Sequence, residues 1–319
     1  MRPPYKITPE ILKLVAVISE KIGEVNARYL HKQNPQLRKQ NKIKTIHSSL
    51  QIEGNTLTEE QVTAIVENKK VTGYQKDILE VKNAIAVYEN LSALKAVSEK
   101  SFLSAHKKLL KGLVQNAGIY RKQGVGIVKG TTVEHVAPPF ARVPFLMQDL
   151  FKYLATDKEI SLIKSCVVHY EIEFIHPFLD GNGRMGRLWQ SVILMEQYPV
   201  FEFLPFETLI SQNQKEYYQV LGCCDKQGES TLFIEFMLRI IYQSLDELVD
   251  YKGRILKDTD RLEYFMDQGS LIFTRKDYMN LFKEISAATA SRDLKKGIEL
   301  KFFEKEGDKK TTIYKIIKR

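Results

Sequence analysis

One stretch of twelve residues, His176-Pro-Phe-Leu-Asp-Gly-Asn-Gly-Arg-Met-Gly-Arg187, holds most of the side chains in this chain that could do chemistry together. Gly181 and Gly183 flank Asn182, so the backbone can turn sharply there and point its N–H groups at an anion. Residues 184–195 then have the spacing of a helix with one apolar face. A glycine turn that leads into a helix N-terminus favours bound negative charge, so the stretch predicts a phosphate site.

The charged residues of this stretch suit the same chemistry. Arg184 and Arg187 are three residues apart, which places both guanidinium groups on one face of a helix, where they could clamp polyphosphate oxygens. Asp180 precedes the turn and could hold a hard cation such as Mg²⁺. His176 could act as a general base, because histidine ordinarily titrates near neutral pH. The stretch therefore indicates phosphoryl or nucleotidyl transfer. The alternative is a polar turn that only joins two core helices.

The stretch closely resembles the signature of the Fic family, His-Pro-Phe-x-(Asp/Glu)-Gly-Asn-Gly-Arg-x-x-Arg, and fills every fixed position of it. The resemblance implies a nucleotidyltransferase that moves a nucleoside monophosphate, usually AMP from ATP, to a protein hydroxyl. It implies that His176 is the general base and that Asp180 is the Mg²⁺ ligand. The resemblance also implies a group of residues around the phosphates: Asp180, Gly181, Asn182, Gly183, Arg184, Met185, Gly186 and Arg187.

A second motif lies earlier in the chain, in residues 45–55, where Gly54 is typical of a helix C-terminus. On spacing alone, Glu53 is a solvated residue at the end of a helix. Ser49-x-x-x-Glu53-Gly54 resembles the inhibitory motif (Ser/Thr)-x-x-x-Glu-(Gly/Asn) of many Fic proteins. The resemblance implies that Glu53 reaches Arg187 and occupies the space of the ATP γ-phosphate. It places the chain in the self-inhibited subclass with an N-terminal inhibitory helix.

Residues 116–144 lose the helical period, and their glycine-separated apolar pieces predict a β-hairpin that ends before Ala137-Pro-Pro. In the Fic family this hairpin, the flap, lies over the active site and holds the target protein by strand pairing. For His135 the alternative is a histidine in a surface loop. The resemblance places four consecutive residues along the nucleotide pocket: Val133, Glu134, His135 and Val136.

The segment 213–221 resembles the family's Tyr-Tyr-x-x-Leu helix, which implies that Tyr217 and the downstream Asp225 border the adenine. Some relatives carry asparagine where this chain has Asp225, so the preference for adenine stays open. Apolar residues at helical spacing predict further helices elsewhere. These include residues 77–97, 101–113, 143–154, 161–174 and 231–248.

The composition is that of an ordinary soluble protein, with 44% hydrophobic and 27% charged residues, and 319 residues suggest two or three domains. The net charge of +9 is compatible with anionic partners without choosing among them. Three cysteines form no disulfide framework, and no Cys/His spacing indicates zinc. The N-terminus does not read as a signal peptide, and no run reaches membrane-spanning length. A cytoplasmic protein is expected.

The sequence pattern changes near residue 255, from long helical segments to shorter helix-like and strand-like segments. Helices are expected to begin at Phe273 and Ser286, and strand-like pieces follow at 300–304 and 311–317. Two short helices followed by a hairpin predict a winged helix-turn-helix.

This C-terminal module has two open interpretations. Arg292, Lys295 and Lys296 could meet DNA phosphates from a recognition helix. However, residues 255–319 hold only fifteen Lys and Arg against eleven Asp and Glu, and winged helices also dock proteins or form dimers. Both DNA binding and protein docking therefore remain possible functions of this module.

Together these observations predict a mainly α protein: a Fic-type helical domain with a β-hairpin flap, followed by a small winged helix-turn-helix domain. The expected parts are an N-terminal helical region (1–100) with the inhibitory helix at about 45–55, a catalytic core (101–250) and the winged helix (255–319). The expected function is an auto-inhibited protein adenylyltransferase that uses ATP and Mg²⁺ to modify a Ser, Thr or Tyr hydroxyl. The alternatives are a DNA-binding regulator that senses nucleotide, or an enzyme that removes AMP. The target protein, self-modification and a homodimer stay open.

Overall fold

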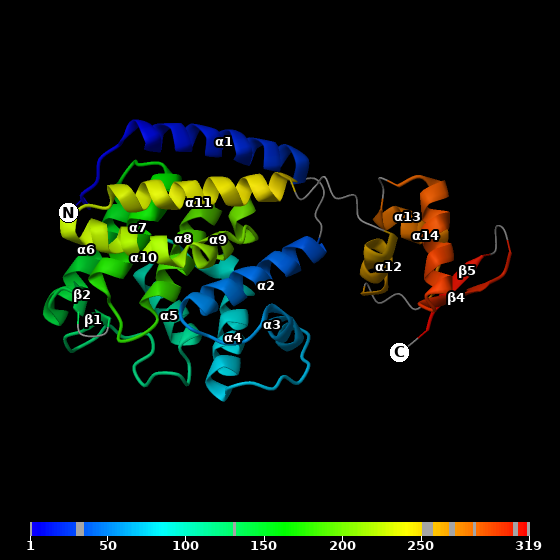
Figure 1. The fold of residues 1–319 in the computed structure, drawn as a ribbon, viewed down its shortest axis with the longest axis horizontal. Coiled ribbons are helices and arrows are strands. Elements are labelled where there is room, and N and C mark those ends of the chain that lie inside the picture. Colours follow the sequence, from blue (N-terminus) through cyan, green and yellow to red (C-terminus); the bar gives the residue numbers. More distant parts are fainter. Residues whose placement is uncertain are drawn as a thin grey trace. The chain divides into compact units, whose positions relative to one another are not determined.

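The computed structural model describes residues 2–29, 35–129, 132–250, 258–267, 272–282, 285–308 and 312–317. The chain divides into two compact units that meet between Val249 and Asp250. Within the described ranges, the larger unit is helical except for one hairpin, and the smaller unit combines helices with a three-stranded sheet (Figure 1). The prediction of a mainly α fold is confirmed.

The larger unit is built from α-helices joined by short turns. In chain order they are α1 (Pro9–Tyr29), α2 (Pro35–Ile52), α3 (Glu59–Val66), α4 (Gln75–Tyr88), α5 (Glu99–Leu109), α6 (Val143–Thr156), α7 (Ser161–Ile175), α8 (Asn182–Gln197), α9 (Phe206–Gln212), α10 (Gln214–Gln227) and α11 (Thr231–Asp250). Three short 3₁₀ turns accompany them: η1 (Leu91–Ala93), η2 (Phe140–Arg142) and η3 (Pro199–Glu202).

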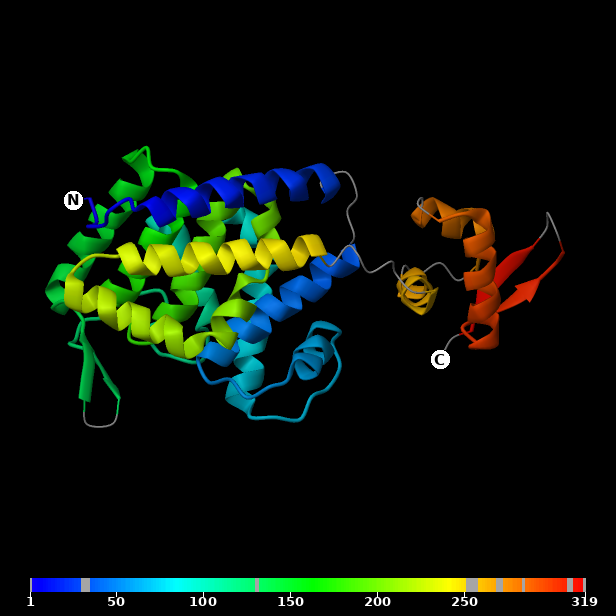
Figure 2. The same cartoon turned by 45° about the horizontal axis from the view of Figure 1, so that its top comes forward.

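The first and last helices of this unit, α1 and α11, run side by side (Figures 1 and 2). Thr8 donates a hydrogen bond to Glu235 at the start of α11, and Lys21 pairs with Asp246 near its end. These contacts tie the N-terminal helix to the rest of the unit.

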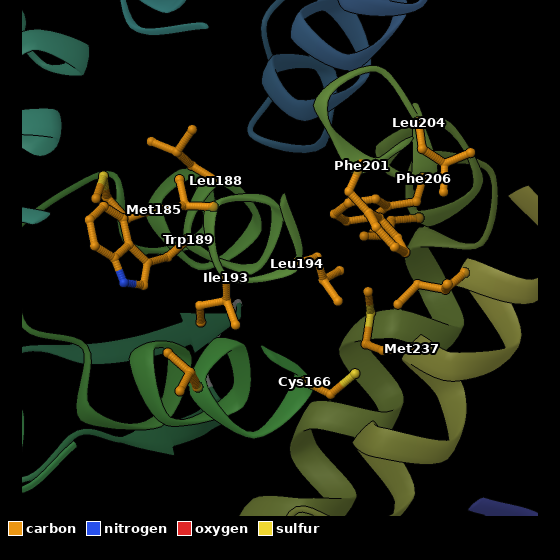
Figure 3. Packing of buried hydrophobic residues seen from close by; sticks show 14 of the residues in the cluster. Cys166, Met185, Leu188, Trp189, Ile193, Leu194, Phe201, Leu204, Phe206 and Met237 are labelled. Atoms are coloured by element: carbon orange, nitrogen blue, oxygen red, sulfur yellow. The ribbon is translucent and has the colours of Figure 1, made fainter. Parts of the chain in front are cut away.

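The core of the larger unit surrounds α8, the helix that follows the glycine turn. Trp189 is fully buried, packs edge-on against Phe102 at 5.0 Å between ring centroids, and donates its indole N–H to the carbonyl of Ala96. Figure 3 shows Met185, Leu188 and Trp189 pointing outward from this helix among apolar side chains. Because α7 and α8 pack tightly on each other, the loop between them is held by a rigid pair of helices.

The strands β1 (Gly126–Lys129) and β2 (Thr132–Val136) form an antiparallel hairpin that pairs Gly126 with Val136. The register shifts between Ile127 and Val128, which leaves Glu134 as the extra residue of a bulge. Figure 2 shows this hairpin (green) projecting from the helices of the larger unit. The hairpin expected within residues 116–144 is therefore present.

The smaller unit contains α12 (Asp258–Asp267), β3 (Ile272–Phe273), α13 (Arg275–Leu281), α14 (Ala287–Glu299), β4 (Phe303–Glu306) and β5 (Ile313–Ile316). Its strands form an antiparallel sheet in the order β3-β5-β4. Inside it, Arg261 makes two hydrogen bonds to Asp293, at 2.7 and 2.8 Å, and Tyr278 donates a third. This buried cluster links α12, α13 and α14. The sequence pattern did not indicate α12 or β3.

Candidate active site

His176 is the first residue of the loop between α7 and α8. It has a left-handed backbone conformation with φ of 51°, which is uncommon for a residue with a side chain. Its N–H donates to the carbonyl of Ile172, and its Nδ1 lies 3.3 Å from the carbonyl of Glu173. Since a carbonyl oxygen can only accept, this contact requires the proton on Nδ1. Nε2 is then the basic nitrogen of the ring.

The side chain of Asn182 closes this loop upon itself. Its Oδ1 accepts from the N–H of Phe178 at 2.8 Å, and its Nδ2 donates to the carbonyl of the same residue at 3.0 Å. Asn182 also begins α8, whose first N–H groups have no partner within the helix. The amide side chain therefore shapes the loop, and the backbone N–H of Asn182 and the second N–H of its amide could still meet a phosphate.

Asp180 lies in the same loop with its side chain 44% exposed. Oδ1 accepts from the N–H of Gly181 at 2.6 Å and from Arg184 Nη2 at 2.8 Å. Among the described residues, Oδ2 has no hydrogen-bond partner. This oxygen is the part of the carboxylate that could ligate a cation.

Arg184 is buried between two carboxylates. It donates to Asp180 and, at 3.2 Å, to Glu80 of α4. The other oxygen of Glu80 accepts from Asn55, directly after the segment of the inhibitory motif. The guanidinium is thereby fixed beside the loop, between Asp180 and Glu80.

Arg187 is the point at which the two sequence motifs meet. Its side chain is fully buried; Nε donates to Ser49 Oγ at 3.1 Å, and Nη2 donates to the Ser49 carbonyl at 2.9 Å and to Glu53 Oε1 at 2.7 Å. Burial alone would lower the pKa of Arg187, but the nearby charges of Glu53, Tyr217 and Glu173 together outweigh it and the pKa is raised. In the described part of the chain, Nη1 has no hydrogen-bond partner.

Two glycines of α8 allow these close approaches. A Cβ added to Gly183 would lie 2.5 Å from Glu53 Oε1 and 3.1 Å from Arg187 Nη1, so any side chain there would displace the carboxylate. A Cβ on Gly186 would lie 2.5 Å from the ring of His169 in α7. Met185, between them, is fully buried in the core. It can therefore offer a ligand only its backbone.

The residues expected around the adenine differ in their burial and in their hydrogen-bond partners. Tyr217 is fully buried, and its hydroxyl donates to Glu173 Oε1 at 3.0 Å instead of facing a ligand. The next residue, Tyr218, is 44% exposed, and burial followed by the charge of Glu53 raises its pKa. Asp225 accepts from the hydroxyl of Tyr170 at 3.0 Å. The backbone of β2 runs beside α10, but the side chains of Val133, Glu134, His135 and Val136 lie outside the described part of the structure.

Sequence reasoning missed Glu173, which lies at the centre of the site. Its carbonyl orients His176, and its carboxylate accepts from Tyr217. Burial would raise the pKa of Glu173, but the interaction with His169, whose Nε2 lies 3.8 Å from Oε1, and the charge of Arg187 lower it, so the carboxylate is ionised. A glutamate three residues before the signature histidine, on the same helical face, was the signal that could have indicated it.

His106 of α5 anchors the loop from the other side, although sequence reasoning gave it no chemical role. Nδ1 accepts from the N–H of Gly118 at 2.7 Å, so Nε2 carries the proton and donates to the carbonyl of Asp180 at 3.0 Å. The ring stacks on Phe178 with 3.5 Å between centroids. Burial lowers the pKa of His106 from 6.5 to about 4, so the ring is neutral at physiological pH.

This lowered pKa predicts a loss of stability in mild acid. Between pH 6.5 and 4 the unfolded state takes up a proton at His106 that the folded state does not, so the free energy of unfolding falls as the pH falls through that window. Between pH 7 and 5 the loss amounts to ~2 kcal/mol. Urea unfolding followed by the fluorescence of Trp189, the single tryptophan, should show a smaller loss in His106→Gln than in wild type or His47→Gln. Equal losses in all three would contradict the prediction.

With the geometry established, comparison with known proteins gives a consistent result. The model of the Fic/DOC family matches residues 96–194. The chain is 30% identical over 233 residues to the protein adenylyltransferase Fic of Drosophila grimshawi, and 29% identical to that of Drosophila melanogaster. Each alignment covers 68% of this chain but only 45% and 44% of the relative. The chain thus spans about half the length of the curated relatives that it matches.

Solved structures extend the similarity to the whole chain. The crystal structure of a Fic family protein from Desulfovibrio desulfuricans G20 has a TM-score of 0.78 and 40% identity, and the comparison covers 100% of this chain and 99% of that one. Fic-1 from C. elegans shares the fold, with a TM-score of 0.64 and 20% identity over 76% of this chain and 73% of that chain. No helix in the described ranges is long and apolar enough to cross a membrane. The resemblance expected from the His176–Arg187 signature is confirmed: the chain belongs to the Fic family.

Proposed function

We propose that this chain is a protein adenylyltransferase that moves AMP from ATP to a Ser, Thr or Tyr hydroxyl of a protein, and that Glu53 holds it inhibited. One arrangement supports both parts of the proposal. His176 offers a basic Nε2 in the loop that leads into α8, and the second arginine of that helix is occupied by the carboxylate of Glu53, directly after α2. The positive charge of Arg187 and the negative charge of Glu53 therefore lie where we propose that the triphosphate binds.

The reaction asks for one proton transfer and one displacement at phosphorus. The hydroxyl oxygen forms a bond to the α-phosphorus, the bond from that phosphorus to the bridging oxygen of the β-phosphate breaks, and pyrophosphate leaves. His176 Nε2 takes the hydroxyl proton. Positioning and charge stabilisation by Arg184, Arg187 and the N–H groups of α8 supply most of the remaining catalysis.

The residues present fit a magnesium ion bound together with ATP. Asp180 offers one carboxylate oxygen, and Mg²⁺ is commonly held by one or two carboxylates plus phosphate oxygens and water. Within the described ranges no group of three or more His, Cys, Asp or Glu side chains could hold a metal alone. We therefore propose that phosphate oxygens and water complete the site. Bound there, Mg²⁺ would neutralise phosphate charge and orient the triphosphate.

The β1–β2 hairpin is the feature that would hold the target protein. Because it projects from the helices, it supports the proposal of a flap that pairs with a strand of the target. The target could also be a second copy of this chain.

The cysteines bear on the compartment in which the reaction takes place. Cys166, Cys223 and Cys224 are all free thiols. Free thiols favour a reducing compartment, so we place the activity in the cytoplasm.

Intact mass tests this function directly. The purified chain and its Glu53→Gly variant are incubated with each nucleoside triphosphate, with and without Mg²⁺, alone and with a mixture of cytoplasmic proteins. The expected result is an added AMP that requires both ATP and Mg²⁺ and is stronger in the variant. If neither form modifies itself or any added protein with any nucleotide, the proposal is wrong.

A second candidate function, DNA binding, is favoured by the exposed face of α14. Arg292 and Lys295 are exposed there, whereas Asp293 is turned inward and held by Arg261. Lys296, which the sequence placed with them, donates to both oxygens of Asp258 and is engaged within the unit. The middle of the helix therefore presents Arg292 and Lys295 to a partner and keeps the carboxylate of Asp293 inside.

The salt dependence of binding to a DNA duplex tests this face. Each phosphate contact contributes about 0.9 to the slope of log K against log salt concentration. Changing Arg292 and Lys295 to alanine should lower the magnitude of that slope by about 2. The control pair, Lys69 and Lys70 to alanine, lies in the larger unit and should leave the slope unchanged. Equal slopes for both double variants would count against DNA and for protein docking.

A further inference from the structure

Arg121, between α5 and β1, makes an unusual set of hydrogen bonds. Its guanidinium donates to four backbone carbonyls, and its own N–H donates to the carbonyl of Pro177 at 2.9 Å. Nε bonds His176 at 2.7 Å, Nη1 bonds Gln123 at 3.0 Å, and Nη2 bonds Ile175 and Pro138. These carbonyls come from the end of α7, the signature loop and both ends of the flap.

The buried guanidinium has no carboxylate partner among the described residues. Arg121 is 3% exposed, and burial lowers its pKa. Its charge is met instead by carbonyl oxygens, including two at the C-terminus of α7, where a helix leaves carbonyls without partners and favours a cation. Because a guanidinium is planar and its donors are fixed in a fork, these carbonyls are held in one geometry.

One of these carbonyls belongs to the general base. The left-handed backbone of His176 is unfavourable for a residue with a side chain and persists only where its surroundings determine it. The bond from Arg121 Nε to the His176 carbonyl holds that conformation from outside the loop. The conformation in turn sets the direction of the imidazole.

The other two carbonyls bracket the flap. Gln123 lies three residues before β1, and Pro138 lies two residues after β2, so both ends of the hairpin are tied to the same guanidinium. A strand that pairs with the flap is therefore placed relative to His176 through a single side chain.

We propose that Arg121 is a positioning residue that sets the distance between a target strand on the flap and Nε2 of His176. The inference rests on the proposed transfer reaction and adds a residue that links its two halves. The guanidinium of Arg121 is already engaged with four backbone carbonyls, so in this proposal it contacts neither ATP nor the target. It acts by fixing the position of the flap relative to the signature loop. That position must be correct to within about 1 Å, because a misplacement of that size costs about a hundredfold in rate.

The test replaces Arg121 with lysine in a Glu53→Gly background. Lysine keeps the charge but has three donors on one nitrogen and cannot span four carbonyls. The kcat for transfer should fall by about ten- to a hundredfold, while the Kd for ATP and the number of nucleotide sites per chain stay the same. The matched control is Arg142→Lys, an exposed arginine just beyond the flap, which should keep the parent kcat.

The two outcomes of this kinetic test are clearly different. If Arg121 only supported the fold, the variant would lose nucleotide sites, and kcat per remaining site would be unchanged. A kcat equal to that of Arg142→Lys, or a fall in sites alone, would overturn the proposal.

Amide hydrogen exchange can be measured without enzymatic activity. It therefore tests the role of Arg121 even if the Glu53→Gly parent transfers no AMP. In Arg121→Lys, exchange should accelerate together in residues 123–129, 132–138 and 175–178, with α11 unchanged. If this variant does not fold, exchange in the parent along a denaturant gradient replaces it. The flap base and residues 175–178 should then open with one common free energy. Acceleration in only one segment, or separate opening energies, would overturn the proposal.

Discussion

Replacing Glu53 with glycine is expected to raise the rate of AMP transfer about tenfold or more, because it removes a carboxylate from the place of a phosphate. Glu53 neutralises Arg187 at 2.7 Å and puts negative charge beside Gly183, at the N-terminus of α8. ATP could still bind through its base and ribose, but its α-phosphate would be displaced from the hydroxyl on the flap. The change in rate should therefore exceed the change in ATP affinity.

Initial rates of labelled AMP incorporation measure this effect. The gain should vanish in a Glu53→Gly, Arg187→Ala double variant, because the released arginine is what places the phosphate. Glu53→Gln separates charge from volume, since the amide fills the same space without the negative charge. Gln51→Gly is the matched control: it changes an exposed residue of the last turn of α2 and should leave the rate unchanged. Equal rates for wild type and Glu53→Gly would return Glu53 to an ordinary residue at a helix end.

The contact between Glu53 and Arg187 was accessible from sequence because both ends belong to recognisable motifs. Spacing alone favoured a solvated Glu53, and only the resemblance connected it to α8. Asn182 shows the limit of such reasoning. The resemblance implied that Asn182 borders the phosphates, which stays a prediction, and it did not indicate that the amide closes the loop on Phe178. A side chain that can both donate and accept fits either role, so its type does not distinguish them.

Residues whose partners are backbone atoms left little trace in the sequence. Arg121 bonds carbonyls, which every residue carries, so no second position marks its role. Tyr217 and Tyr218 show a different difficulty. Neighbours in a helix point about 100° apart, and the phase of α10 buries Tyr217 and exposes Tyr218. The resemblance named Tyr217 beside the adenine, and nothing in the sequence indicated that Tyr218 would be the exposed member of the pair.

The boundaries of elements were predicted less well than their existence. One long helix was expected over residues 77–97, but α4 ends at Tyr88, and a 3₁₀ turn follows in which Leu91 is buried. The strand expected at 300–304 begins later, at Phe303, because Leu300 caps α14 and Lys301 has a φ of 58°. Both differences arise where a helix stops, which depends on tertiary packing more than on local propensity.

Replacing His176 with alanine is expected to abolish measurable transfer while ATP binding stays nearly intact. A general base contributes about 10²–10⁴ to the rate, and the groups proposed to hold ATP (Asp180, Arg184 and Arg187) do not include this ring. A large loss of transfer rate with little change in ATP affinity would identify His176 as the general base. A fall in ATP affinity as large as the fall in rate would mean that His176 holds the nucleotide instead.

The backbone of His176 requires a second variant for a clear answer. Alanine is poorly suited to a left-handed φ of 51°, so His176→Ala could move the loop as well as remove the base. Asparagine adopts this region more readily and has no basic nitrogen, so His176→Asn keeps the loop and removes only the proton acceptor. Both variants should lose transfer in the Glu53→Gly background, and binding of ATP should be closest to the parent in His176→Asn. If His176→Asn kept the parent rate, the proton would have to leave the hydroxyl by another route, and the histidine would serve the loop instead of the chemistry.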